Sequence, residues 1–86
     1  MKTNKKIILG QTIVEILWED AWSDPGYYTI DELSRERPYH IESVGIVLRN
    51  DKSGITTARE RMANGRYRTI QHIARAMIRK VEVLRA

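Results

Sequence analysis

Hydrophobic and polar residues alternate along most of this chain, and the alternation is clearest in its N-terminal quarter. Val14, Ile16 and Trp18 fall on one face of an extended strand, whereas the intervening glutamates fall on the other. The glutamate face also carries Ile13 and Leu17, which indicates a strand that is covered on both sides or lies at a subunit contact. The β-branched and aromatic content favours a strand over a helix.

A turn and a short helix are predicted next. Pro25 and the glycine after it are typical of a tight turn, because proline presets its own backbone dihedral angle and glycine tolerates the left-handed conformation. Thr29 and Glu32 have the spacing of a capping box, and Pro38 prevents a long continuation. The pattern predicts a short helix over residues 30–36.

Two further strands are predicted around a turn at residues 51–54. The first strand has two faces, with Val44, Ile46 and Leu48 on one and Gly45, Val47 and Arg49 on the other. A glycine in mid-strand marks a bulge, a sharp bend or a close backbone approach, as the corner of a small barrel requires. Asn64 and Gly65 predict a second turn and a further strand.

The C-terminal stretch from residue 70 to residue 84 fits two structures. Its apolar residues recur at helical spacing: Ile70, Ile73, Ala74, Met77, Ile78, Val81 and Leu84. Residues 80–84 also alternate as a strand, and the strands before them need a partner to avoid an open edge. The pattern alone leaves both a helix and a strand, turn and strand open.

Length indicates a single small domain, and the charge distribution bears on the kind of partner the protein binds. Residues 1–86 make one small domain with a loose N-terminal arm at residues 1–6. Residues 1–48 hold five Lys or Arg against eight Asp or Glu, a net −3, while residues 49–86 hold ten against three, a net +7. The basic second half fits an anionic partner such as nucleic acid, and it equally fits a solvated surface.

Several function classes are disfavoured. The chain has no cysteine and no apolar run long enough to cross a membrane, so we expect a cytoplasmic protein with no membrane contact. It has no glycine-rich phosphate loop or nucleophile elbow, and His40 and His72 lack a second ligand at metal spacing. Glu19, Asp20 and Asp24 lack the spaced oxygen ligands of a cation loop. We therefore expect a protein that is not an enzyme and needs no metal or cofactor.

The segments "VEILWEDA", "ELSRE", "SVGIVLRND" and "IARAMIRKVEVL" together resemble a family of short phage-encoded proteins, and that family resembles Sm-like proteins. The resemblance covers residues 11–84. It implies a mainly β fold, a small five-stranded Sm-like (SH3-like) barrel with one short helix, which assembles into a homo-oligomeric ring. Members of the phage family carry a proline where this chain has Ala74, which favours strand, turn and strand for the C-terminal stretch.

The resemblance also implies a nucleic-acid site and, for a phage protein, the cytoplasm of the infected cell. Arg75 stands where Sm-like proteins carry the arginine of an Arg-Gly pair, although Ala76 replaces the glycine. Asn50 lies in the loop that offers hydrogen bonds to a base, although the rest of the loop motif is not matched. Together with Arg49 and Lys52 these residues would lie at the pore of the ring and bind single-stranded RNA or DNA.

A second basic cluster flanks the turn at Asn64 and Gly65. Arg66, Tyr67 and Arg68 combine positive charge with an aromatic ring, and Arg59 and Arg61 add to the charge. This combination suits single-stranded nucleic acid, and it equally suits a solvated hairpin. The other aromatic residues are expected to lie in the core or at a subunit contact, because acidic surroundings repel phosphate. They are Trp18, Trp22, Tyr27, Tyr28 and Tyr39.

Two alternative functions remain open. One is a ring that serves as a structural or host-protein interaction module without nucleic acid. The other is a helix-turn-helix DNA-binding protein, in which residues 29–36 and 40–49 form two helices. Gly45 and the β-branched residues of the second segment disfavour a helix there.

Overall fold

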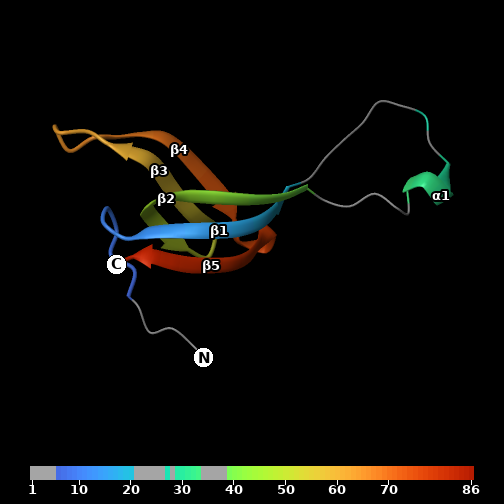
Figure 1. Cartoon of the computed structure of the whole chain (residues 1–86), viewed down its shortest axis with the longest axis horizontal. Coiled ribbons are helices and arrows are strands. Elements are labelled where there is room, and N and C mark those ends of the chain that lie inside the picture. The colour runs from blue at the N-terminus through green and yellow to red at the C-terminus, as the bar shows by residue number, and fades with distance from the viewer. Residues whose placement is uncertain (1–5, 21–26, 28, 34–38) are drawn as a thin grey trace.

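The structure is a computed structural model, and it describes residues 6–20, 27, 29–33 and 39–86. Five antiparallel strands form one sheet in the order β4-β3-β2-β1-β5 (Figure 1). The elements in chain order are β1 (Ile13–Asp20), α1 (Ile30–Leu33), β2 (Tyr39–Asp51), β3 (Gly54–Arg61), β4 (Tyr67–Ala74), the 3-10 turn η1 (Arg75–Met77) and β5 (Ile78–Arg85). The predicted mainly β fold is confirmed, and the sheet remains open, with β4 and β5 as its edges.

Strand β2 holds the sheet together because it pairs with two neighbours in succession. Its first part, Tyr39 to Ile46, pairs with β1, and its last part, Ile46 to Asp51, pairs with β3. The change of partner occurs beside Gly45. A Cβ atom on Gly45 would lie 2.7 Å from Thr57 Cβ and 3.0 Å from the Ala58 carbonyl oxygen, so only glycine permits this approach of β3. The close backbone approach predicted for Gly45 is confirmed.

The core lies on the concave face of the curled sheet. Its buried side chains come from four strands: Val14, Ile16, Trp18, Val47, Ile55 and Ile73. The predicted inward face of β1 is confirmed. On β2 the buried residues are Ser43, Gly45 and Val47, while Val44 on the more apolar face is exposed. The outer face of β2 is therefore an apolar surface that this single chain leaves in part uncovered.

The helical interpretation of the C-terminal stretch is wrong, and so is the second helix of the helix-turn-helix alternative. The stretch forms β4, η1 and β5, and Ala74 is extended, with φ −60° and ψ 139°. Ile73 is buried whereas Ile70 is exposed, so the helical stripe does not lie on one face. The second proposed DNA-binding helix falls within β2.

The local signals for turns and for the helix start are borne out. The Thr29 hydroxyl oxygen accepts a hydrogen bond from the Glu32 N–H at 3.1 Å, and Glu32 Oε1 accepts one from the Thr29 N–H at 3.4 Å, which completes the capping box. Both predicted turns are present, and Gly65 adopts φ 84°. The turn at Pro25, residues 1–5 of the arm and the predicted end of the helix beyond Leu33 lie outside the described residues.

No helix in the described part of the chain is long and apolar enough to span a membrane.

The role of Gly45 can be tested by Gly45→Ala. We expect the added methyl group to lower the free energy of unfolding by about 1–3 kcal/mol, because it overpacks the contact with Thr57 and the Ala58 carbonyl. Urea denaturation followed by circular dichroism measures this difference. The control is Val44→Ala on the outer face, expected within about 0.5 kcal/mol of the parent. Equal stability of both variants would contradict the close-packing role of Gly45.

Candidate nucleic-acid interface

The turn between β2 and β3 is organised around the carboxylate of Asp51. Ser53 donates to Asp51 Oδ1 from its backbone N–H at 2.9 Å and from its hydroxyl at 2.6 Å. Arg49 Nε donates to Asp51 Oδ2 at 2.5 Å. An aspartate that accepts from the backbone two residues later forms an Asx-turn, which fixes the loop without help from a partner strand.

Arg75 joins this turn to the start of η1. Its backbone N–H donates to the Ser53 carbonyl at 3.0 Å. Its guanidinium Nη2 donates to Asn50 Oδ1 at 2.5 Å and to the Asp51 carbonyl at 2.6 Å. The structure thus brings Arg49, Asn50 and Arg75 together, with Lys52 at the tip of the same turn.

The polar atoms that remain unused at this site are donors. Arg75 Nε and Nη1 make no hydrogen bond with a described residue, and neither do the two terminal nitrogens of Arg49, the Asn50 amide nitrogen or the exposed Lys52 ammonium. The turn and Arg75 together supply three cations and one carboxylate, that of Asp51, which already accepts hydrogen bonds from Arg49 and Ser53. The arrangement suits a ligand that offers anionic or neutral hydrogen-bond acceptors.

The carboxylate of Asp51 stays ionised to a lower pH than that of a free aspartate. Hydrogen bonds from the Ser53 side chain, then from Arg49, hold the pKa of Asp51 well below its ordinary value of 3.8. The negative charge of Asp51 therefore organises the turn throughout the neutral range. Ser53 and Asp51 were not among the predicted site residues, although an aspartate two residues before a serine in a turn is the sequence signal for this arrangement.

The second predicted cluster lies at the opposite end of β3 and does not join the first. Tyr67 Oη donates to the Gly10 carbonyl at 3.2 Å, and Arg61 Nη1 donates to the same oxygen at 2.9 Å. Arg68 makes a bidentate ion pair with Glu60, at 2.6 and 3.1 Å, which lowers the pKa of Glu60. These contacts hold the N-terminal segment and the hairpin in place.

Arg66 in that cluster is exposed, and its guanidinium has no partner among the described residues. Of the acidic residues Glu19, Asp20 and Asp24, Glu19 accepts from Arg79 Nη2 at 2.9 Å and lies 3.3 Å from His40 Nε2, and Asp24 lies outside the described residues. Among the aromatic residues Trp18 is buried and Tyr27 is fully exposed, while the side chains of Trp22, Tyr28 and Tyr39 lie outside the described part.

Ser53→Ala tests the organisation of the turn. We expect the pKa of Asp51 to rise toward 3.8, because the largest contribution to its low value is the Ser53 hydroxyl. A titration of the side-chain carboxyl carbon of Asp51 by NMR measures the shift. A folded-state pKa below the unfolded value stabilises the turn above pH 3.8, and this stabilisation is lost as the pH falls through the folded pKa. An Asp51 pKa at or above 3.8 in the parent protein would refute this geometry.

No family model matches the chain, and no curated protein and no solved structure matches it. The fold and the geometry of the β2–β3 turn are therefore the grounds for assigning a function.

Proposed function

We propose that this chain is an Sm-like protein of the phage-encoded kind, which forms a homo-oligomeric ring and binds single-stranded RNA or DNA. The binding surface is the β2–β3 turn together with Arg75. The observation that carries the proposal is the set of outward donors held in place around Arg75 and Asn50.

The fold supports the barrel part of this proposal. A single five-stranded antiparallel sheet in which β2 pairs with both β1 and β3, and in which a 3-10 turn separates β4 from β5, is what a small Sm-like barrel would require. The order of these strands along the chain also agrees with the order of the segments that carry the sequence resemblance. Within one chain the sheet stays open, and β4 and β5 each keep one free edge.

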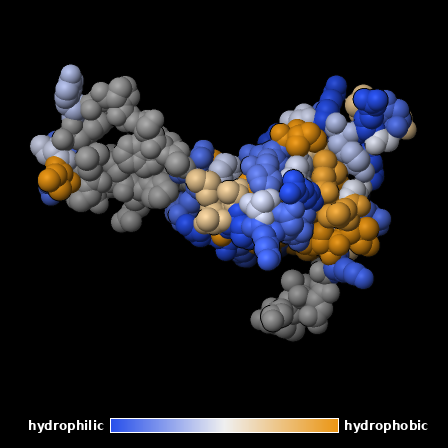
Figure 2. Space-filling model, turned by 180° about the vertical axis from the view of Figure 1, so that it is seen from behind, coloured by the Kyte–Doolittle hydropathy of each residue, from blue (hydrophilic) through white to orange (hydrophobic). Residues whose placement is uncertain are grey.

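The free edges also support assembly. Each of β4 and β5 pairs on one side only and so carries unpaired backbone N–H and C=O groups on its outer side. Pairing of β4 in one subunit with β5 in the next is a head-to-tail contact, which forms a ring when the rotation closes. Ile70 on β4 and Leu84 on β5 are 54% and 49% exposed in the single chain. The space-filling view from behind shows hydrophobic residues at the surface among hydrophilic ones (Figure 2). A subunit contact would remove both from water.

The chemistry of the turn supports the choice of a single-stranded nucleic acid. Arginine and lysine donors bind phosphate oxygens, and the Asn50 amide can donate to an acceptor on a base edge. No aromatic ring is among the residues bonded in the turn, so bases would be held there by hydrogen bonds and charge. A ring that contacts an acidic protein through the same surface is the remaining alternative, and the following experiment separates the two.

Binding is tested by fluorescence anisotropy with a labelled U-rich RNA and a matched duplex DNA at low and moderate salt. We expect preferential binding of the single strand, with an affinity that falls as salt rises. Arg75→Ala and Arg49→Ala should each weaken binding and lower the slope of log affinity against log salt by about 0.7. Lys80→Ala on β5 removes the same charge away from the turn and should keep the affinity. Absence of binding at low salt would exclude nucleic acid as the ligand.

Assembly is tested by native mass spectrometry of Leu84→Lys. The parent protein should be a closed oligomer, and the variant should be a folded monomer, because a charge on the β5 edge blocks strand pairing. The control is Leu9→Lys, which changes an exposed leucine outside the sheet edges and should leave the oligomer intact. A monomeric parent would contradict the proposed ring.

A further inference from the structure

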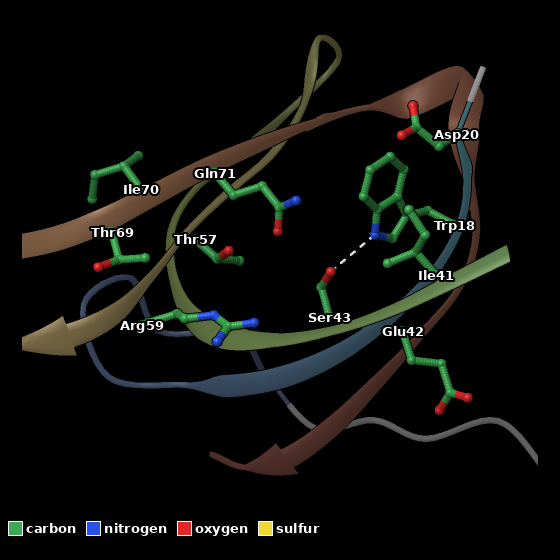
Figure 3. Close-up of a pocket in the computed structure, with 10 residues that line it drawn as sticks. All are labelled: Trp18, Asp20, Ile41, Glu42, Ser43, Thr57, Arg59, Thr69, Ile70 and Gln71. Carbon is green, nitrogen blue, oxygen red and sulfur yellow. Dashed lines mark hydrogen bonds between the residues drawn. The ribbon is translucent and has the colours of Figure 1, made fainter. Parts of the chain in front are cut away.

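A hollow of about 490 Å³ opens on the concave face of the sheet, away from the β2–β3 turn (Figure 3). The end of β1, the first part of β2 and the middle of β3 and β4 form its walls. None of its lining residues belongs to the turn at residues 51–54 or to η1. The hollow is therefore separate from the proposed binding surface at the turn.

The register of the sheet determines which side chains face the hollow. Trp18 lies opposite Ile41 in the pairing of β1 with β2, and Thr57 lies opposite Gln71 in the pairing of β3 with β4. The indole of Trp18 borders the space, and its Nε1 donates to Ser43 Oγ at 3.0 Å (Figure 3). This buried hydrogen bond fixes the orientation of the indole, so the apolar wall is formed before any ligand arrives.

Two polar side chains extend into the space without a partner. In Figure 3 the guanidinium of Arg59 and the amide of Gln71 both point toward the centre of the hollow. Neither side chain makes a hydrogen bond or ion pair with a described residue, and both are exposed. Their donors and the amide oxygen are thus free to bind a ligand beside the apolar wall.

The backbone of β4 is irregular at the wall next to Arg59. Thr69 adopts φ 61°, a conformation that β-branched residues rarely adopt. In the pairing of β3 with β4, Ala58 lies opposite Ile70 and Glu60 lies opposite Arg68, but Arg59 and Thr69 between them are not paired. Such outliers gather at ligand sites, and this one lies where Arg59 enters the hollow.

The charges around the hollow disfavour an anionic group inside it, so a nucleotide would leave its phosphate outside. Among the described residues that line the hollow, Arg59 is the one cation and Asp20 and Glu42 are the two carboxylates, of which Glu42 points away from the centre (Figure 3). A neutral planar group with hydrogen-bonding edges fits better: its face can contact Trp18 and Ile41 while its edge meets the polar side chains. Nucleobases have this combination of properties.

We infer that the hollow binds one unpaired purine base of a single strand, with guanine preferred. Arginine donates two parallel hydrogen bonds to guanine O6 and N7, and the glutamine amide can bind the remaining polar edge of a purine. Uracil lacks such a pair of adjacent acceptors, because its protonated N3 separates O2 from O4, and it leaves Arg59 with one acceptor at most. This inference rests on the proposed binding of single-stranded nucleic acid, to which it adds a base-specific pocket separate from the phosphate-binding turn.

The test uses free nucleotides, so that the hollow is measured apart from the turn. In a Trp22→Phe background Trp18 is the only tryptophan, and GMP should quench its fluorescence in a saturable way. UMP should bind more weakly. Arg59→Ala and Gln71→Leu should each weaken GMP binding at least about fivefold, since a bidentate pair is worth roughly that factor or more. Arg85→Ala, a matched loss of charge on β5, should leave it unchanged.

The two proposals fail separately. Arg75→Ala should weaken binding of the RNA oligonucleotide and leave quenching by GMP intact. The purine pocket is refuted if GMP causes no saturable quenching of the parent protein. It is also refuted if GMP binds the Arg59→Ala and Gln71→Leu variants as tightly as it binds the parent. Either result leaves oligonucleotide binding at the turn unaffected. If the parent protein binds no oligonucleotide, the proposed function is refuted instead.

Discussion

The close approach of β2 and β3 at Gly45 is the constraint on which the rest of the structure depends. One strand must pair with β1 along its first part and with β3 along its last part, and a side chain at residue 45 would collide with Thr57. Because the sheet curls there, the inward residues of four strands meet in one small core. A chain of 86 residues has little other means of burying enough apolar surface, since a domain this small buries only about 60% of the surface its unfolded chain exposes.

The fold also determines which basic residues in the second half of the chain form ion pairs. Arg68 and Arg79 pair with Glu60 and Glu19, so part of the charge stabilises the surface of the sheet. At the β2–β3 turn the cations outnumber the single carboxylate, and Arg75 comes from a different connection of the sheet. Basic residues from two connections of the sheet thus lie together at this turn, where a polyanion could be bound.

Much of the fold is predictable from alternation, and the rest depends on contacts distant in sequence. The faces of β1, the turn at residues 51–54 and the role of Gly45 follow from local pattern, and the structure confirms them. The C-terminal stretch is ambiguous in sequence because its apolar residues recur at helical spacing. In the structure these residues lie on opposite faces of strands, with Ile70 exposed and Ile73 buried. The meeting of Arg75 with the turn came from the resemblance, since the residues are more than twenty positions apart. The bond from Tyr67 to Gly10 and the hollow beside Trp18 have no local signal at all.

The central claim is that the β2–β3 turn and Arg75 form one binding surface for a single strand. The most direct measurement is a set of amide and arginine side-chain NMR spectra of isotopically labelled protein, recorded while a single-stranded oligonucleotide is added at low salt. We expect the largest shifts at Asn50 to Gly54 and at the Arg75 guanidinium, whose Nε makes no hydrogen bond within the described part of the chain. Shifts confined to the turn at residues 62–66, or no shifts at all, would contradict the claim.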